Sequence, residues 1–295
     1  MRRVHVIINP ISGQPKPVLY TLNSVFREAG VAWDVSVTQN RGDACRAAKK
    51  AAAQGVDVVA AYGGDGTVLE AATGLLGTTT PLAILPGGTA NILSVELGIP
   101  HDLAAAARIA CREDSPIRKV DLGQSGEQFF IQRIGIGLDA DKVNRATREL
   151  KQKYGRLAYS IGWLQAVHET PRARYRLRLD GREEEAEGVT CHIANAGSTG
   201  VPGLVLLPDI SVSDGLLDVL VVRDVSIGSA LSIASIAAGH PIHPEAFHHW
   251  QAREITVSTD SPQRIHADGE MWEDTPITVQ VLPEAVSILT PSAAQ

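Results

Sequence analysis

Residues 56–76 read VDVVAAYGGDGTVLEAATGLL, and this stretch determines the fold of the first part of the chain. The run Val56–Ala61 has the length and apolar composition of a buried strand. A glycine-rich turn, Gly63–Thr67, follows it, and Val68–Leu76 then has the composition of a helix. A strand, a glycine turn and a helix in direct succession predict a parallel sheet that is covered by helices.

The same alternation extends from residue 1 to about residue 98. Gly30 and Gly55 indicate helix ends, and Asp43 is predicted as an N-cap. We expect strands at Val4–Ile8, Trp33–Thr38, Val56–Ala61 and Leu82–Leu85, and helices at Val18–Ala29, Asp43–Gln54 and Val68–Leu76. Ligands of open parallel sheets bind at the carboxyl ends of the strands, so the turns Asn9–Gly13, Gly63–Thr67 and Pro86–Asn91 are expected to line one crevice.

Beyond residue 115 the pattern changes to alternating runs that are separated by turn dipeptides such as Asp180-Gly181. This pattern predicts a mainly antiparallel second domain. We place the domains at 1–120 and 121–295, with room for the C-terminal tail to pack back on the first domain. A two-residue turn at 180–181 would pair opposite charges and so form a self-neutralised solvent face rather than an anion site: Arg178 with Glu183, Arg176 with Glu185 and Arg174 with Glu187.

Composition excludes several classes of protein. The chain has 295 residues, of which 44% are hydrophobic, and a net charge of -6, so no overall basic field is present to hold nucleic acid. The apolar run Val4–Ile8 ends at Asn9-Pro10 and is too short for a secretory signal, and no stretch reaches the roughly 20 apolar residues that span a bilayer. We therefore expect a cytoplasmic protein. Its three scattered cysteines predict buried thiols rather than disulfides or a zinc site.

The turn at 63–67 has the chemistry of a phosphate site. Gly63, Gly64 and Gly66 let the backbone approach an anion closely, and the first N–H groups of the following helix point at the same place. Asp65 would repel a phosphate, so its expected task is to hold Mg²⁺ directly or through water. The turn Pro86–Asn91 adds further N–H groups, although neither a P-loop nor a dinucleotide fingerprint is present.

Taken in order, these motifs resemble those of the diacylglycerol kinase catalytic family, which includes sphingosine and ceramide kinases, and most closely its compact bacterial members. The resemblance covers nearly the whole chain. It rests on Asn9–Gly13, Gly63–Thr67 with Glu70, Pro86–Asn91, Val120–Gly123, Gly135–Asp139, Asp214–Asp218 and Asp268–Glu270.

This resemblance implies an α/β N-terminal domain of the phosphofructokinase or NAD kinase type with a Rossmann-like parallel sheet, followed by a β-rich antiparallel sandwich that binds lipid. It implies a catalytic cleft between the two, ATP and Mg²⁺ as cofactors, and a membrane-lipid hydroxyl such as that of diacylglycerol as the acceptor. The expected nucleotide-binding residues are Asn9, Ser12, Gly13, Gly63, Gly64, Gly66, Thr67, Gly87, Gly88, Thr89 and Asn91.

The resemblance also implies roles for the acidic residues. Asp268 of the Asp-Gly-Glu turn would be the general base toward the lipid hydroxyl, and Glu270 would help to organise Mg²⁺. Asp65 and Asp121 would join the same metal network, with Asp65 also counted as catalytic. A separate structural Mg²⁺ site would use the Asp214 side chain with backbone carbonyls such as those of Ser211 and Leu216.

One departure from the family pattern leaves alternatives open. Many relatives have an acidic residue directly after Asn91, whereas this chain has Ile92. Either Asp65, Asp121 and Glu270 suffice for the metal, or catalysis or substrate choice differs. Ile92 also leaves open a non-catalytic lipid or nucleotide sensor. A kinase of NAD or another soluble metabolite is the competing enzyme, because such kinases share the Gly-Gly-Asp-Gly-Thr turn.

The expected partners follow from the lipid acceptor. A local basic patch at Lys142–Arg156 would allow transient peripheral contact with a membrane, although a solvated helix face explains it equally well. A histidine-rich stretch, His240–His249, lacks the spacing of a catalytic zinc site and is interpreted as a polar loop. Further helices are expected at Lys142–Lys153, Leu157–Val167 and Ile227–Ala238. The sequence leaves a homo-oligomer open.

Overall fold

The computed structural model describes residues 2–13, 17–137, 170–201, 204–205, 209–223 and 247–292. The chain divides into two compact units. The first comprises Met1–Leu122 together with Leu282–Gln295, and the second comprises Gly123–Val281. Each unit is described below by itself.

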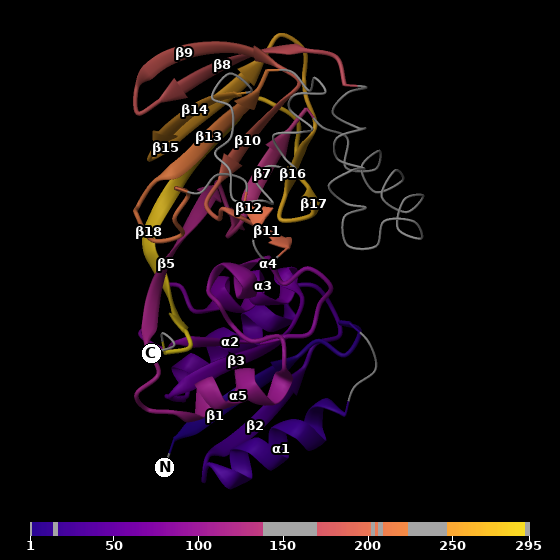
Figure 1. The fold of residues 1–295 in the computed structure, drawn as a ribbon, viewed down its shortest axis with the longest axis vertical. Coiled ribbons are helices and arrows are strands. Elements are labelled where there is room, and N and C mark those ends of the chain that lie inside the picture. Colours follow the sequence, from indigo (N-terminus) through magenta and orange to yellow (C-terminus); the bar gives the residue numbers. More distant parts are fainter. Residues whose placement is uncertain are drawn as a thin grey trace. The chain divides into compact units, whose positions relative to one another are not determined.

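The first unit is built on four parallel strands in the order β2-β1-β3-β4 (Figure 1). A helix follows each of the first three strands, so the chain alternates strand and helix as the glycine-punctuated pattern predicts. The elements are β1 Arg3–Ile8, α1 Val18–Glu28, β2 Ala32–Val37, α2 Asp43–Ala53, β3 Val58–Gly63, α3 Asp65–Gly74, β4 Leu82–Pro86, α4 Ile92–Glu96 and α5 Leu103–Cys111.

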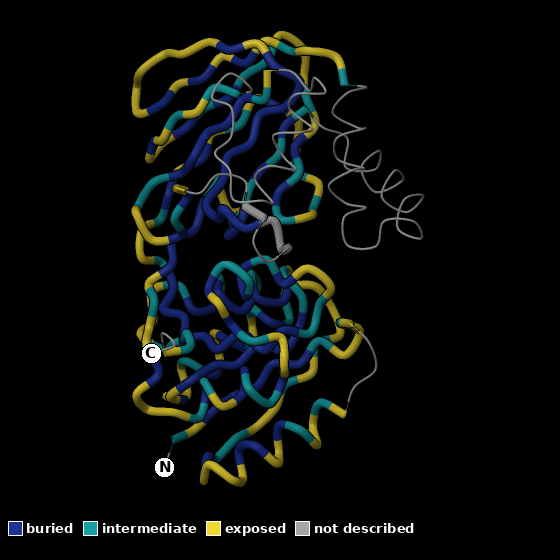
Figure 2. Tube along the Cα trace, viewed as in Figure 1, coloured by how far each residue is buried: buried dark blue, intermediate teal, exposed yellow. Residues whose placement is uncertain are grey.

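Burial explains this arrangement. All six residues of β3 are buried, which agrees with a central strand covered on both faces. Helix α1 buries Leu22, Val25 and Phe26 and exposes most of its other residues, an alternation that Figure 2 shows along the helix. Helices α2 and α3 pack closely at Gly74, where a Cβ atom would lie 2.3 Å from the Cys45 carbonyl oxygen.

The strands and helices expected in this unit are confirmed with small shifts of their ends, and two details were wrong. Helix α3 begins at Asp65 rather than at Val68, so most of the glycine turn is the first turn of the helix. The N-cap of α2 is Gly42 rather than Asp43, because the Asp43 carboxylate accepts from the N–H groups of Gln39 and Asn40 before the helix. Helices α4 and α5 were not predicted.

The second unit is a β-sandwich of mainly antiparallel strands, which confirms the predicted fold class. One sheet has the order β14-β13-β10-β7-β16-β17, and β18, β15, β8 and β9 lie consecutively in the other. The remaining strands are β5 Ile117–Ser125, β6 Gln128–Phe130, β7 Arg133–Ile136, β8 Ala173–Leu179, β9 Arg182–Gly188, β10 Thr190–Ala194, β11 Ser198–Val201, β12 Leu204–Val205, β13 Leu217–Val222, β14 Phe247–Ala252, β15 Glu254–Thr259, β16 Ile265–Ala267, β17 Glu270–Met271 and β18 Ile277–Leu289. Residues 117–122 of β5 and 282–289 of β18 belong to the first unit.

The core of this sandwich comes from the inward-facing residues of both sheets. Ile134, Ile193 and Val219 from one sheet share a buried cluster with Tyr175 and Ile255 from the other. The clean alternation of buried and exposed residues along β8 is the pattern of a strand with one face in the core and one in solvent.

The hairpin of β8 and β9 has the predicted register. Its strands pair Arg174 with Glu187, Arg176 with Glu185 and Arg178 with Glu183 across a turn in which Asp180 and Gly181 have φ of 47° and 83°. The side chains of the first two pairs are bridged at 3.3 Å and 3.4 Å. The interpretation of this face as self-neutralised is therefore confirmed for those pairs, whereas Arg178 hydrogen-bonds Thr256 instead.

Some expectations lie outside the described residues. These are the helices at 142–153, 157–167 and 227–238, the basic patch at 142–156, and the first part of the histidine stretch. The end of that stretch is not a loop, because His248 and His249 lie in strand β14. In the part of the chain that the structure describes, no helix combines the length and apolar character needed to cross a membrane.

Candidate functional site

Three glycine turns meet at the carboxyl ends of the parallel strands in the first unit. The carbonyl oxygen of Gly63 accepts from the N–H groups of Gly87 and Gly88 at 2.9 Å and 3.1 Å. Gly13, at φ 73°, approaches so closely that a Cβ atom there would lie 2.0 Å from the Gly87 oxygen. The turns 9–13, 63–67 and 86–91 therefore lie against one another, as their positions after adjacent parallel strands predict.

Side chains lock this junction. The Asn9 amide donates to the Thr67 hydroxyl at 3.0 Å, which links the turn after β1 to helix α3. Thr67 is buried beneath Gly63, where a Cβ atom would lie 2.5 Å from the threonine side chain. Asn91, with φ of 50°, accepts from the Gly88 N–H at 3.0 Å and donates to the Gly88 carbonyl at 2.8 Å. A larger residue at Gly13, Gly63 or Gly88 would disturb these contacts.

Asp65 has a structural task that the sequence did not indicate. Its Oδ1 accepts from the Ile92 N–H at 2.8 Å, which caps helix α4 and ties the turn after β3 to the turn after β4. Burial raises the pKa of the Asp65 carboxyl, and hydrogen bonds from the N–H groups of Ile92, Leu93 and Asn91 oppose that rise. The link uses the backbone of Ile92, so the unusual side chain at this position does not affect it.

The backbone at the start of helix α3 is exposed. Nothing lies within 4 Å of a Cβ atom built at Gly66, and Gly66 is exposed. Gly66 lies in the first turn of α3, a helix of 10 residues whose initial N–H groups have no partner within the helix. Ser12, next to Gly13 in the sequence, is partly exposed. Thr89, next to Gly88, is exposed. Exposed N–H groups at a helix N-terminus favour a phosphate.

Asp121 lies in the first unit and is almost completely buried, with 1% of its surface exposed. Its Oδ1 accepts from the Glu284 N–H at 2.7 Å. Glu284 has φ of 51°, a conformation that costs energy for a residue with a side chain. Asp121 thus holds a strained bend in strand β18, and a metal role for it stays a prediction.

Asp268 lies in a tight hairpin turn of the second unit, with Ala267 and Glu270 paired on either side and φ of 49° at Asp268 and 88° at Gly269. Its side chain is not directed to solvent as in an ordinary turn. The carboxylate accepts from three successive N–H groups, those of Ile131 at 2.7 Å, Arg133 at 2.9 Å and Gln132 at 3.1 Å. Backbone contacts from a distant loop therefore fix its orientation.

The same surroundings also shift the pKa of the Asp268 carboxyl. Burial raises the pKa of this carboxyl from 3.8 to about 6, and the three N–H groups and the Arg133 charge act in the opposite direction. A carboxylate accepts up to about four hydrogen bonds, so the three N–H donors leave capacity for one more. A fixed carboxylate with a pKa near 6 suits a general base at neutral pH.

Arg133 is a neighbour that the sequence analysis missed. Its N–H donates to Asp268, its carbonyl accepts from the Asp268 N–H at 3.1 Å, and its guanidinium donates to the Ser198 carbonyl. Its charge also helps to lower the pKa of His192, which burial brings to about 4. A single charged residue within the otherwise uncharged stretch 129–136 was the available signal.

The predicted structural Mg²⁺ residues lie in one loop before strand β13. The Asp214 carboxylate is exposed and accepts from the Leu216 N–H at 3.0 Å, and the Ser211 hydroxyl accepts from the Ser213 N–H at 3.3 Å. Among the described residues, no group of three or more His, Cys, Asp or Glu side chains could hold a metal ion. The metal assignments of Asp65, Asp121 and Asp214 are thus not supported by a preformed carboxylate cluster there.

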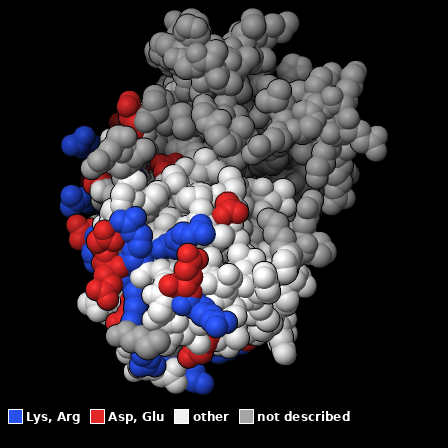
Figure 3. Space-filling view, turned by 60° about the horizontal axis from the view of Figure 1, so that its bottom comes forward, with Lys and Arg blue, Asp and Glu red and all other residues white. Residues whose placement is uncertain are grey.

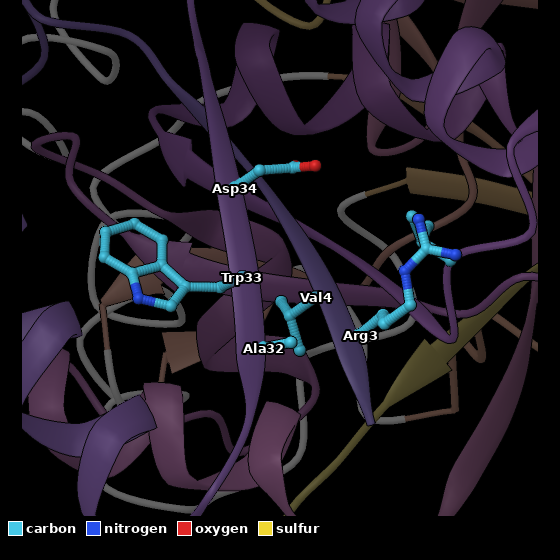
Figure 4. Close-up of a pocket in the computed structure, with 6 residues that line it drawn as sticks. Arg3, Val4, Ala32, Trp33 and Asp34 are labelled. Atoms are coloured by element: carbon cyan, nitrogen blue, oxygen red, sulfur yellow. The ribbon is translucent and has the colours of Figure 1, made fainter. Parts of the chain in front are cut away.

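A small pocket elsewhere in the first unit does not belong to this site. It has a volume of ≈ 110 Å³ and is lined by Arg3, Val4, Ala32, Trp33, Asp34 and Val56 (Figure 4). These residues lie at or near the beginnings of β1, β2 and β3, whereas ligands of open parallel sheets bind at the opposite, carboxyl ends.

Known proteins match both units. Residues 3–125 match the diacylglycerol kinase catalytic domain, and residues 132–290 match the YegS C-terminal NAD kinase beta sandwich-like domain. A diacylglycerol kinase of Mycobacterium tuberculosis is 32% identical over 98% of this chain and 95% of its own length, and one from Bacillus subtilis is 29% identical over 92% and 90%. The crystal structure of a diacylglycerol kinase from Bacillus anthracis superposes with a TM-score of 0.79 at 28% identity, covering 99% of this chain and 97% of that one.

Proposed function

The chain belongs to the family of diacylglycerol kinases and related lipid kinases, and on that premise we propose that it transfers the γ-phosphoryl group of ATP to the hydroxyl of a membrane lipid such as diacylglycerol. The observation that carries the proposal is the junction of three glycine turns at the carboxyl ends of the parallel strands. It offers exposed backbone N–H groups where a nucleotide phosphate would bind.

In this proposal the phosphates of ATP lie over Gly64 and Gly66, at the N-terminus of α3. Asn9 and Asn91 act as positioning residues, since their hydrogen bonds to Thr67 and to Gly88 hold the turns in place. Mg²⁺ would neutralise charge on the phosphates. Mg²⁺ usually keeps several waters and binds through one or two carboxylates plus substrate phosphates, so Asp65 would be the protein ligand at this turn.

Asp268 is the base in this proposal. The Asp268 carboxylate accepts the proton of the lipid hydroxyl as that oxygen attacks the γ-phosphorus, the bond to the β-γ bridging oxygen breaks, and ADP leaves. With a pKa of about 6, Asp268 is mostly ionised at neutral pH and ready to accept that proton. The three N–H donors keep it in one orientation, which reduces the reorganisation needed during the reaction.

The test is incubation of the purified protein with ATP labelled at the γ position, Mg²⁺ and a total lipid extract. We expect label in a lipid product, whose identity names the acceptor, and little label when Asp268→Asn replaces the wild type. Unlabelled lipids from a protein that binds ATP would overturn the proposal. A parallel incubation with NAD in place of lipid tests the competing soluble-metabolite kinase, and binding of lipid and ATP without transfer would favour a sensor.

The protein has to reach its acceptor at a bilayer surface, so we also propose transient peripheral contact between a cytoplasmic protein and the membrane. Sedimentation with vesicles that contain the labelled lipid identified above measures this contact. We expect a reversible fraction to bind, because the net charge of -6 gives no overall attraction to anionic lipid.

A further inference from the structure

We propose that Asn195 is a positioning residue for the base Asp268, which it orients through the backbone of the loop at 131–133. This inference rests on the function proposed above and deepens it. Asn195, the loop and Asp268 all belong to the second unit. They lie at the ends of strands β10, β7 and β16, which are neighbours in one sheet (Figure 1).

Asn195 is a polar residue in a buried position. It follows directly after β10, all five residues of which are buried, and it has no exposed surface itself. The charged side chains on the face shown in Figure 3 lie instead at the surface, where water solvates them. Burying an amide costs free energy unless the amide is hydrogen-bonded. The Asn195 amide donates to the Ile131 carbonyl oxygen at 2.8 Å, so the side chain is tied to the loop that holds Asp268.

This bond fixes one of the N–H groups that contact Asp268. A carbonyl group and the N–H group of the next residue lie in one rigid peptide plane. The Ile131 carbonyl therefore shares its plane with the N–H of Gln132, which donates to Asp268 Oδ1 at 3.1 Å. Turning that N–H away from the carboxylate would also turn the carbonyl away from Asn195. The Asn195 side chain thus resists rotation of this plane.

The backbone after β10 fixes the next peptide plane in the same way. The N–H groups of Asn195 and Ala196 donate to the Gln132 carbonyl at 2.8 Å and 3.0 Å. That carbonyl shares its plane with the Arg133 N–H, which donates to Asp268 Oδ1 at 2.9 Å. Two of the three N–H donors to Asp268 are consequently held in place from positions 195 and 196.

The orientation of Asp268 matters for the proposed reaction. A general base must come within hydrogen-bond reach of the proton that it accepts, and a misplacement of about 1 Å can lower a rate by about 100-fold. Asn195 acts on Asp268 through the loop, and the expected nucleotide-binding turns lie in the first unit. Loss of its side chain should therefore lower kcat and leave the KM for ATP unchanged.

Asn195→Ala tests this role in the lipid kinase assay with γ-labelled ATP. We expect kcat to fall at least about fivefold. Thr190→Val is the matched control, because Thr190 is equally buried on β10 and its hydroxyl donates to the Ile136 carbonyl at 2.9 Å. That carbonyl shares its plane with the Gly137 N–H, which donates to a backbone carbonyl and not to a carboxylate. The kcat of Thr190→Val should therefore equal that of the wild type.

A double-mutant cycle separates a role through Asp268 from a general loss of structure. If Asn195 acts through Asp268, Asn195→Ala should change kcat by less than about twofold when Asp268→Asn is already present. A purely structural role would lower kcat by the same factor in both backgrounds. Asn195→Ser, which keeps a donor on a shorter side chain, is measured in parallel and takes the place of an Asn195→Ala protein that does not fold. It should show a smaller loss with the same dependence on Asp268.

Hydrogen exchange of the backbone amides gives a readout that does not require activity. The amides of Ile131, Gln132 and Arg133 should exchange faster in Asn195→Ala than in the wild type or Thr190→Val. A wild type that labels no lipid would overturn the proposed function and this inference with it. With an active wild type, a smaller loss of kcat than expected, an equal loss in the Asp268→Asn background, or unchanged exchange at 131–133 would overturn the role of Asn195 alone.

Discussion

Asp268 makes the stability of the protein depend on pH in a direction opposite to that of most carboxylates. Its pKa is about 6 in the folded protein, compared with 3.8 for an ordinary aspartate. A carboxyl group whose pKa is raised by folding binds its proton more tightly in the folded than in the unfolded state. Its contribution therefore favours folding at low pH and is lost as the pH rises from about 4 to above 6.

The magnitude follows from the difference between the two pKa values. Each pH unit of difference corresponds to ~1.4 kcal/mol, so ionising Asp268 at neutral pH reduces the free energy of unfolding by about 3 kcal/mol. The variant Asp268→Asn has no titrating group at this position. The free energy of unfolding of the wild type, measured relative to this variant, should thus fall by up to about 3 kcal/mol between pH 4 and pH 7.

Urea denaturation at half-unit steps over this pH range measures both proteins. The difference between them is the informative quantity, because the asparagine amide also meets the N–H donors of Ile131 and Arg133 and lowers stability at every pH. Asp274→Asn, which removes an exposed carboxyl in the same unit, is the control substitution. If the wild-type and Asp268→Asn curves run parallel within about 0.5 kcal/mol, Asp268 does not titrate in this window and the reasoning is refuted.

Three further outcomes are expected. The lipid kinase rate should rise with pH through about 6 and level off above 7, since Asp268 must be ionised to accept a proton, and a rate that is flat from pH 5 to 8 would exclude this base. Gly66→Ala should fold with a free energy of unfolding that is unchanged or raised by up to about 1 kcal/mol, and yet bind ATP more weakly by titration calorimetry. Gly63→Ala, whose Cβ would lie 2.5 Å from Thr67, should lower the free energy of unfolding by about 1–3 kcal/mol, as measured by urea denaturation. Equal stability of the two variants would contradict the packing argument. Glu70→Gln should cost about 1–2 kcal/mol by the same method, because the Glu70 carboxylate accepts from the N–H groups of Gly42 and Ala44 at the start of α2, and the exposed Glu113→Gln serves as its control.

The sequence anticipated those features that depend on local pattern. The strands and helices around residues 56–76 follow from the spacing of apolar residues and glycines, and the charge pairs of the β8–β9 hairpin follow from counting outward from Asp180-Gly181. Turns after adjacent parallel strands must share one edge of the sheet, so the meeting of three glycine turns was also predictable.

The roles of the acidic residues were less predictable, because a carboxylate serves equally well as a metal ligand, a base or a helix cap. Asp65, expected at a metal, caps α4, and Glu70 caps α2 from a position 28 residues away. The pattern of the sequence gives the position of such a side chain along its own element, but its partners lie on other elements.

The sequence by itself determined the fold class and the location of the glycine turns, because both depend on residues that are close together in the chain. Only the tertiary structure decided the orientation and the pKa of the Asp268 side chain. Its three hydrogen-bond donors precede it by 135 to 137 residues, and its pKa depends on burial by the surrounding fold. Electrostatic energies depend on distance in space and on exclusion of water, and neither quantity is written in the order of residues.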